Sequence, residues 1–392
     1  MGGSGGPATI RLREGRDRPL RLRHPWVLSG SVASVEGDPK AGDTVQVVDS
    51  HGDQLGLGDF DPDSQIRVRI HSLGPGDPDP DESWLPNRIK AALDWRSRHP
   101  SLRDTDALRL IHSEGDDLPG LSVDRYADWL VVKPTTPGMR RRAERIGKIL
   151  APLTGTTGVW LRGNDSREPG KPSRELFGSV PEEPVAIHER DRMYWVDIRH
   201  GQKTGFYLDQ REARDLFAAL APGRRALDLF SYTGGFAVAA LRAGAHEVVA
   251  VESSPAAHTL LCRNAPEAEA VLADVSEFLR KDQRSFDLIA LDPPPFARRK
   301  RDVPRASRAY KDLQLWALRR AALDAHLLSF SCSHHITPEL FRKVAFSAAQ
   351  DAGAKLQLLG TLQAPPDHPT ALNHPQGEYL TGLVLRVLEP AR

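Results

Sequence analysis

The sequence predicts an α/β protein whose C-terminal half is built on a doubly wound, mainly parallel sheet of the Rossmann-like type. From about Asp197 onward, short apolar runs alternate with amphipathic helical segments such as YKDLQLWALRRAALD and PELFRKVAFSAAQDAG. The runs that we interpret as strands are RALDLF, EVVAVE, AEAVLAD, FDLIALDPP and HLLSFSCS. Near-continuous apolar strands are typical of sheets covered on both faces, and strand–helix alternation makes such sheets parallel.

The first half of the chain predicts two smaller domains. Runs such as DTVQVVDS and QIRVRIHSL, separated by Gly, Asp and Pro clusters, indicate a small β-barrel over residues 1–80. The stretch GPGDPDPDESWLP indicates a linker near Pro80, because it cannot bury a core and its X-Pro bonds favour extended backbone. Residues 81–190 combine an amphipathic helix, a hairpin-like strand pair and a basic helix, which predicts a small α+β central domain.

Residues 191–392 form the third predicted domain, which contains the parallel sheet. The chain ends in KLQLLGTL and EYLTGLVLRVL, two strand-like runs joined by a Pro-rich loop. We expect these runs to form a hairpin at one edge of the sheet rather than to be joined by another crossover helix.

Composition limits the classes of function. The 53 basic and 52 acidic residues leave a net charge of +1, so a surface that attracts nucleic acid must be local. Two cysteines cannot build a disulfide framework, and no closed metal site is recognisable, so reduced thiols are expected. No apolar run approaches membrane-spanning length, and MGGSGGPATI lacks the features of a signal peptide. We therefore expect a cytoplasmic protein with no membrane partner and no metal.

Chemically versatile side chains stand at the ends of five successive predicted strands. They are Asp228, Glu252, Asp274, Asp292 and Cys332. In an open α/β sheet, ligands bind at the carboxyl ends of the strands near the point where the strand order reverses, so these residues are expected to converge on one cleft. Gly234 and Gly235 follow the first of these strands and let the backbone approach a ligand closely. Taken singly, Asp274 fits a helix N-cap equally well, and Cys332 fits a small buried apolar residue.

Several motifs along the whole chain resemble one enzyme family. The stretch FSYTGGFAV lacks the G-x-G-x-x-G fingerprint of dinucleotide binding, and acidic strand ends suit a cofactor without phosphates. LDLFSYTGG, DPPPF, SCSHH and GQKTGFYLDQRE resemble the AdoMet-dependent 23S rRNA cytosine-C5 methyltransferase family of the RlmI type. RHPWVLSGSV is similar to the PUA domain of that family, RLIHSEGDDLPGLSVDRY to its central domain, and DHP with GEYLTGLVLRV to its C-terminal strands.

The resemblance implies a PUA-like RNA-binding domain, a central domain and a class I methyltransferase domain. It implies S-adenosyl-L-methionine (AdoMet) as the cofactor and 23S rRNA, or the assembling large ribosomal subunit, as the partner; a homodimer is left open. The implied AdoMet loop contains Asp228, Phe230, Tyr232 and Gly234, while Glu252 would hold the ribose hydroxyls and Asp274 would face the adenine amino group. The implied catalytic pair is Cys332, as nucleophile, and Asp292, with Pro293, Pro294 and Phe296 beside it in the base pocket.

The implied reaction explains why a cysteine is needed. C5 of cytosine is too weak a nucleophile to attack the methyl group of AdoMet, whereas a thiolate that adds to C6 makes C5 reactive. The thiolate is the reacting species, so Cys332 is expected to have surroundings that lower its pKa. His334 and His335 either take part in the chemistry or only hydrogen-bond within the loop.

The base that resolves the adduct is not identified. Many RNA cytosine-C5 methyltransferases carry a second cysteine just after their DPP-like motif, where this chain has Pro295 and Phe296. The RlmI-type pattern also lacks that cysteine, so the implied mechanism is unaffected. The chain's other cysteine, Cys262, lies in the apolar helical run AAHTLLCRNA, and we interpret it as structural.

RNA contact is expected from a local basic stretch, FARRKRDVPRASR. It places Arg298, Arg299, Lys300, Arg301 and Arg305 directly after the predicted base pocket, where phosphates flanking a flipped base would lie. The alternative is a solvated charged loop. Two other functions stay open, a guanine-methylating rRNA enzyme and a catalytically silent RNA-binding protein of ribosome assembly; Cys332 argues against the first and the acidic strand ends against the second.

Overall fold

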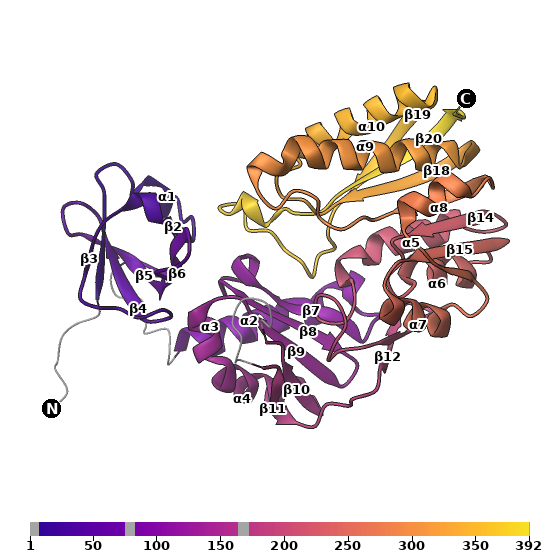
Figure 1. Ribbon diagram of the computed structural model, residues 1–392. Coiled ribbons are helices and arrows are strands. Elements are labelled where there is room, and N and C mark those ends of the chain that lie inside the picture. Colours follow the sequence, from indigo (N-terminus) through magenta and orange to yellow (C-terminus); the bar gives the residue numbers. More distant parts are fainter. Residues whose placement is uncertain (1–7, 75–82, 164–171, 392) are drawn as a thin grey trace. The chain divides into compact units, whose positions relative to one another are not determined.

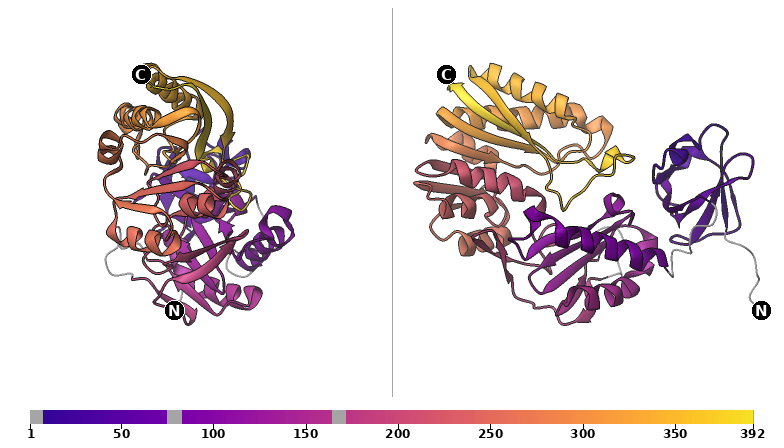
Figure 2. Two further views of the ribbon diagram at one scale, coloured as in Figure 1. Left: turned by 90° about the vertical axis from the view of Figure 1, so that its right-hand side faces the viewer. Right: turned by 180° about the vertical axis from the view of Figure 1, so that it is seen from behind.

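The computed structural model describes residues 8–74, 83–163 and 172–391, and its ribbon is shown from three sides in Figures 1 and 2. The chain forms two compact units. The first comprises Met1–Glu182 with Pro366–Gly377, and the second comprises Glu183–Pro365 with Glu378–Arg392. The predicted linker falls largely on residues 75–82, which lie outside the described residues, and the three predicted domain boundaries stay predictions.

A six-stranded sheet forms the N-terminal part of the first unit, in the order β2-β6-β5-β4-β1-β3. Alternate side chains of its strands, such as Ile10 and Leu12 or Val45 and Val47, are buried, as expected for strands with one face on a core. The elements are β1 (Thr9–Leu12), α1 (Arg18–Arg21), β2 (Trp26–Leu28), β3 (Val32–Glu36), β4 (Thr44–Val48), β5 (Gln54–Phe60) and β6 (Ile66–Leu73).

A five-stranded sheet, β11-β10-β9-β8-β7, forms the rest of the first unit together with three helices. The predicted strand pair is confirmed, because β8 and β9 are antiparallel neighbours joined by a short turn. The segment Pro366–Gly377 returns to this sheet, where the Arg109 backbone N–H donates to Asp367 Oδ2 over 3.0 Å. The elements are α2 (Leu85–Arg98), β7 (Ala107–His112), η4 (Ser113–Asp116), β8 (Leu121–Tyr126), β9 (Trp129–Pro134), α3 (Pro137–Arg141), α4 (Ala143–Thr154), β10 (Gly158–Leu161) and β11 (Arg174–Gly178).

The second unit contains a seven-stranded sheet in the order β16-β15-β14-β17-β18-β20-β19 (Figure 1). The first five of these strands pair in parallel, as predicted. The expected edge hairpin is also confirmed, since β20 runs antiparallel to both β18 and the edge strand β19.

Strands and helices alternate along most of the second unit. They are β12 (Val185–Glu189), β13 (Arg192–Val196), η5 (Leu208–Gln210), α5 (Arg211–Leu220), β14 (Arg225–Leu229), α6 (Gly235–Arg242), β15 (Glu247–Glu252), α7 (Pro255–Asn264), β16 (Glu269–Leu272), α8 (Val275–Lys281), β17 (Phe286–Leu291), η6 (Lys300–Asp302), α9 (Val303–Arg319), β18 (Ala321–Ser331), α10 (Pro338–Ala352), β19 (Lys355–Leu362) and β20 (Thr381–Glu389).

Helices cover both faces of this sheet. Leu313 of α9 and Phe341 of α10 share one buried cluster with Leu327 of β18. Phe330 points the other way by strand alternation, and its ring stacks on Phe236 of α6 with centroids 5.8 Å apart. Because β14 lies between β15 and β17, the chain winds in opposite directions from this strand, so the strand order reverses between β14 and β17. A ligand site is expected at the carboxyl ends of these strands.

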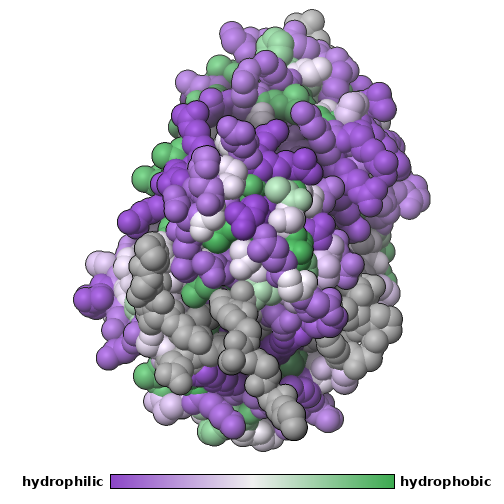
Figure 3. Space-filling view, turned by 90° about the vertical axis from the view of Figure 1, so that its left-hand side faces the viewer, coloured by the Kyte–Doolittle hydropathy of each residue, from purple (hydrophilic) through white to green (hydrophobic). Residues whose placement is uncertain are grey.

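The described residues contain neither a membrane-spanning helix nor a cluster of metal-ligating side chains. None of the helices in these ranges is long and apolar enough to cross a membrane. No group of three or more His, Cys, Asp or Glu side chains within the same ranges is placed to hold a metal ion. Hydrophilic residues dominate the face shown in Figure 3.

Candidate functional site

A cavity of about 830 Å³ lies at the carboxyl ends of the parallel strands of the second unit. The predicted site residues that line it are Phe230, Tyr232, Glu252, Asp274, Asp292, Pro293, Pro294, Phe296 and Cys332. The structure thus brings four of the five predicted strand-end side chains to one cavity. The exception is Asp228, and Gly234 is also absent from the cavity wall.

The loop after β14 adopts an uncommon backbone conformation. Phe230 and Tyr232 have φ angles of 61° and 50°, in the left-handed region that L-residues rarely adopt. Gly234 has φ 85°, and a Cβ atom there would lie 2.7 Å from Leu261 Cδ1, so this position needs glycine. Strained backbone of this kind persists where the surrounding structure enforces it, and it clusters at ligand sites.

Asp228 supports this loop from inside the protein. Its side chain is 1% exposed, and Oδ2 accepts a hydrogen bond from the Ala237 N–H over 3.0 Å. The carboxyl therefore fixes the start of α6 against β14. Burial, which is the largest cause, raises the pKa of Asp228 to about 7, and the nearby carboxylates of Asp292 and Glu252 add to this effect.

Two carboxylates on the cavity wall are held in place by backbone N–H groups. Glu252 ends β15, where Oε2 accepts from Tyr232 N over 2.9 Å and Oε1 accepts from Ser254 N over 2.7 Å. Asp274 caps α8 by accepting from Glu277 N over 3.0 Å, and it also lines the cavity. Both interpretations of Asp274, as a cap and as a cavity residue, therefore hold, and each carboxylate oxygen has lone pairs left for a ligand hydroxyl or amino group.

Cys332 follows β18 directly and faces the DPPPF loop. Its Sγ lies 4.0 Å from the carbonyl oxygen of Pro293. The neighbouring Ser333 connects the two loops, because its Oγ accepts from the backbone N–H groups of Phe296 over 3.1 Å and Ala297 over 3.2 Å. Sequence reasoning missed this role of Ser333, since nothing in SCSHH shows which backbone groups its hydroxyl reaches.

The pKa of the Cys332 thiol differs from the sequence-based expectation. Burial is the largest cause that raises it to about 12, the charge of Asp292 contributes to this rise, and the Lys203 ammonium opposes it. The expectation of a lowered pKa is therefore wrong for the free protein, because desolvation outweighs the one nearby cation. Asp292 itself has a pKa of about 6, raised mainly by burial and opposed by a hydrogen bond that Gln210 Nε2 donates over 2.8 Å. At neutral pH the thiol is protonated and Asp292 is mostly ionised.

The segment GQKTGFYLDQRE supplies a further wall of the cavity that sequence reasoning left without roles. The Lys203 ammonium contacts the carboxylate of Asp209 and lies 4.2 Å from the ring centroid of Tyr207. Tyr379, from the segment before β20, donates its hydroxyl to Asp209 Oδ2 over 2.7 Å. The concentration of charged and aromatic residues just before α5 is the only sequence signal of this wall.

Other predicted residues lie away from the cavity wall. Arg298, Arg299, Lys300, Arg301 and Arg305 are exposed around η6 and the start of α9, and none of them lines the cavity. His334 and His335 are likewise outside it. Cys262 is exposed on α7, which differs from the expected structural role, because the helix turns Leu261 rather than Cys262 into the core.

The charges of the site suit a cationic ligand that carries hydroxyl groups. Glu252, Asp274 and Asp292 line one cavity, and burial, partly opposed by the charges of Lys203 and Arg214, raises the pKa of Asp292. AdoMet carries a sulfonium, an ammonium and two ribose hydroxyls, so the residues present fit this cofactor. Glu252 would accept from the hydroxyls, and Asp274 would accept from the adenine amino group.

Comparisons with known families agree with this geometry. Residues 10–73 match the PUA-like domain family, and residues 139–370, more than half of the chain, match the S-adenosylmethionine-dependent methyltransferase family. Ribosomal RNA large subunit methyltransferase I of Tolumonas auensis is 38% identical over 395 residues, covering 97% of this chain and 99% of that protein. The protein of the same name from Escherichia coli O127:H6 is 36% identical over 392 residues, covering 96% and 98%.

Solved structures share the fold. A protein assigned as a methyltransferase and complexed with SAH has a TM-score of 0.83 at 21% identity, covering 97% of this chain and 100% of its own. A protein assigned as a SAM-dependent methyltransferase, from Streptococcus mutans, has a TM-score of 0.80 at 20% identity over the same shares. The predicted fold class is thereby confirmed.

Proposed function

Because this chain belongs to the ribosomal RNA large subunit methyltransferase I family of AdoMet-dependent enzymes, we propose that it forms 5-methylcytidine in 23S rRNA through a covalent bond between Cys332 and C6 of the target cytosine. Family membership makes the protein an AdoMet-dependent rRNA methyltransferase with an N-terminal PUA-like domain. Cytosine C5 and the covalent step are proposed from the resemblance carried by DPPPF and SCSHH, and the presence of Cys332 in the cavity supports them.

One observation carries the proposal: a cysteine thiol shares the cavity with the carboxylates that fit AdoMet. Enzymes that methylate a nitrogen of guanine need no such thiol, because the base supplies its own nucleophile. C5 of cytosine is a weak carbon nucleophile, and addition of the Cys332 thiolate to C6 places electron density on C5. AdoMet, when bound, supplies the methyl group. Removal of the C5 proton then lets the Sγ–C6 bond break, with its electron pair returning to sulfur.

Cys332 must lose a proton before it reacts, and Asp292 is the group that we propose accepts it. The two residues line the same cavity, and the charge of Asp292 raises the pKa of the Cys332 thiol. With a pKa of about 6, Asp292 is ionised at neutral pH and can take up the proton. Pro293, Pro294 and Phe296 follow Asp292 and would form the wall against which the flipped cytosine packs.

We propose that RNA is held by two further features. The exposed basic residues from Arg298 to Arg305 directly follow the DPPPF loop, so they can reach phosphates next to the flipped base. The PUA-like domain would hold a more distant part of 23S rRNA or of the assembling large subunit. An enzyme that modifies ribosomal RNA would act in the cytoplasm. A homodimer is compatible with these roles.

Trapping of the covalent adduct tests the proposal. RNA with 5-fluorocytidine at the target should stall as a protein–RNA adduct, because fluorine cannot leave as a proton does. Cys332→Ala should form neither adduct nor product but should still bind AdoMet, whereas the matched variant Cys262→Ala should behave like the parent protein. If Cys332→Ala methylates RNA at the parent rate, the covalent mechanism is wrong and a guanine-methylating reaction becomes the better account. If no variant and no parent protein methylates RNA while RNA still binds, the non-catalytic alternative is favoured.

A further inference from the structure

One wall of the cavity of about 830 Å³ is a loop that belongs to no helix or strand. β17 ends at Leu291, and the next regular element, η6, begins at Lys300. Between them, four consecutive residues line the cavity, namely Pro293, Pro294, Pro295 and Phe296. Proline has no backbone N–H, so three of these four residues have no backbone hydrogen bond to donate. Other parts of the chain must therefore hold this wall in place.

Ser333 supplies the hydrogen bonds that hold the wall. Its Oγ accepts from the backbone N–H of Phe296 over 3.1 Å and from that of Ala297 over 3.2 Å. These are the first two N–H groups after the three prolines, so the loop is attached as close to them as its sequence allows. Ser333 is 2% exposed and does not itself line the cavity. Its influence on a bound base must therefore pass through the loop.

Tyr310 of α9 holds the Ser333 side chain in turn. The Tyr310 hydroxyl oxygen lies 2.9 Å from Ser333 Oγ, and the Tyr310 ring packs against Phe296 with centroids 4.8 Å apart. The same ring meets Phe341 of α10 with centroids 5.4 Å apart. Tyr310 is fully buried, and a side chain in a close-packed interior has little freedom to move. The serine hydroxyl and the loop are thus both supported by α9 and α10.

Ser333 is also the chain neighbour of the proposed nucleophile. Cys332 follows β18 directly, and its Sγ lies 4.0 Å from the carbonyl oxygen of Pro293. Because adjacent residues share a peptide bond, the hydrogen bonds of Ser333 couple the position of the wall to the position of Sγ. Reacting atoms must come within about 3 to 3.5 Å of each other, and a misplacement of about 1 Å can cost about 10²-fold in rate.

From these contacts we propose that Ser333 is a positioning residue for the methyl transfer: its hydroxyl holds the wall of residues 293–296 at the separation from Cys332 that lets a flipped cytosine present C6 to the sulfur. The hydroxyl forms no bond to the substrate and transfers no proton. This inference rests on the proposed function in taking cytosine as the target and Cys332 as the nucleophile.

Ser329 provides a matched control for loss of a buried hydroxyl. It belongs to β18, it is 1% exposed, and its Oγ accepts from Gln314 Nε2 of α9 over 2.9 Å. Neither Ser329 nor Gln314 lines the cavity. Replacing Ser329 or Ser333 with alanine therefore removes a hydrogen bond between the same parts of the domain, but only Ser333 bonds the wall of the base pocket.

The rate of adduct formation tests this role. The probe is 23S rRNA transcribed with 5-fluorocytidine in place of cytidine, with AdoMet at saturation. Ser333→Ala should form the covalent adduct about 10- to 100-fold more slowly than the parent protein, because the released wall no longer holds C6 against Sγ. Ser329→Ala should form it at nearly the parent rate. AdoMet affinity in calorimetry and RNA affinity in fluorescence anisotropy should be unchanged in both variants, and urea unfolding measures the stability that each variant loses.

Tyr310→Phe tests the same contact while Ser333 stays in place. It removes the hydroxyl beside Ser333 Oγ and keeps the ring that packs against Phe296. Adduct formation should slow by about two- to tenfold, as expected for the loss of one neutral hydrogen bond. This variant decides the matter if Ser333→Ala does not fold, since a parent rate in Tyr310→Phe would then overturn the proposal.

Three results with Ser333→Ala would overturn the positioning role. They are an adduct that forms at the parent rate, a slowing equal to that of Ser329→Ala, and a loss of AdoMet affinity that accounts for the slowing. In each case an adduct in the parent protein leaves the proposed function standing. If instead the parent protein methylates 23S rRNA and forms no adduct with the 5-fluorocytidine RNA, the proposed covalent mechanism is wrong, and the role of Ser333 fails with it.

Discussion

Replacing Asp228 with asparagine should change the pH dependence of folding in a direction set by burial of the carboxyl group. The side chain is 1% exposed, and its pKa is raised from 3.8 to about 7, with burial as the main cause. In the unfolded chain the carboxyl ionises at its ordinary value, so between these two pH values the folded protein binds the extra proton. The stability contributed by the protonated carboxyl is complete below about pH 4 and is lost as the pH rises to about 7.

The size of the effect follows from the shift. About three pKa units correspond to roughly 4 kcal/mol of stability that the parent protein loses across this range. Asparagine does not ionise, and its side-chain oxygen can still accept from the Ala237 N–H. Its buried NH₂ group lacks the solvation it has in water, at a cost of about 1 to 3 kcal/mol at every pH. Asp228→Asn should therefore be less stable than the parent protein below about pH 4 and more stable, by about 1 to 3 kcal/mol, above about pH 8.

Urea unfolding of both proteins at about pH 4 and about pH 8.5 measures this change. The difference in unfolding free energy between variant and parent should move by roughly 4 kcal/mol between the two conditions and should reverse its sign. Asp191→Asn, at an exposed aspartate, is the control and should give nearly the same small difference at both pH values. A pH-independent difference for Asp228→Asn would show that the carboxyl is not buried as the structure places it.

Three further outcomes concern the site itself. Glu252→Ala should weaken AdoMet binding by about 1.5 to 3 kcal/mol in calorimetry while the fold stays intact, and an unchanged affinity would remove Glu252 from the site. Neutralising Arg298, Arg299 and Arg301 should lower the salt dependence of RNA binding by about 0.7 in log–log slope for each lost contact with single-stranded RNA, without affecting AdoMet; an unaltered slope would favour a solvated loop. Asp292→Asn should slow methyl transfer by about 10² to 10⁴-fold. The parent protein should lose rate below about pH 6, as Asp292 becomes protonated, and the variant should not show this loss. A normal rate in the variant would exclude Asp292 as the proton acceptor.

The sequence predicted much of the sheet because strand ends are local features. An apolar run that stops at a polar residue marks the end of a buried strand, and parallel strands bring such ends to one edge. Glu252, Asp274, Asp292 and Cys332 reach the cavity for this reason. Asp228 does not, because it stands one residue before the end of β14, and its side chain turns toward Ala237 of α6 instead.

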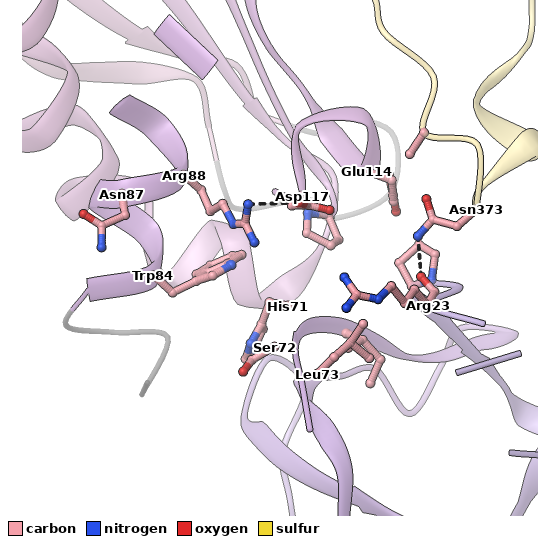
Figure 4. A pocket seen from close by; sticks show the side chains of 14 residues that line it. Arg23, His71, Ser72, Leu73, Trp84, Asn87, Arg88, Glu114, Asp117 and Asn373 are labelled. Carbon is pink, nitrogen blue, oxygen red and sulfur yellow. Dashed lines mark hydrogen bonds and ion pairs between the residues drawn. The ribbon is translucent and has the colours of Figure 1, made fainter. Parts of the chain in front are cut away.

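Contacts between segments that are distant along the chain could not be predicted from the sequence. Tyr379 reaches Asp209 across 170 positions, and the hydroxyl of Ser333 bonds backbone groups at Phe296 and Ala297. The wall of the cavity of about 480 Å³ in the first unit likewise combines distant residues such as Trp84 and Asn373 (Figure 4). Each of these contacts depends on how the loops fold over the sheets. Neither the periodicity of apolar residues nor the spacing of motifs shows how the loops fold.

The raised pKa of Cys332 has a mechanistic consequence, since its causes do not act independently. The negative charge of Asp292 raises the pKa of the thiol, and the thiolate would in turn make Asp292 easier to protonate. Transfer of the proton from Sγ to Asp292 therefore removes one of the charges that opposed formation of the thiolate. The Lys203 ammonium, which lowers the pKa of both groups, favours whichever of them carries the charge. In the proposed mechanism, transfer of this proton to Asp292 accompanies attack of Cys332 on C6, whereas in the free protein at neutral pH the thiol stays protonated and Asp292 is mostly ionised.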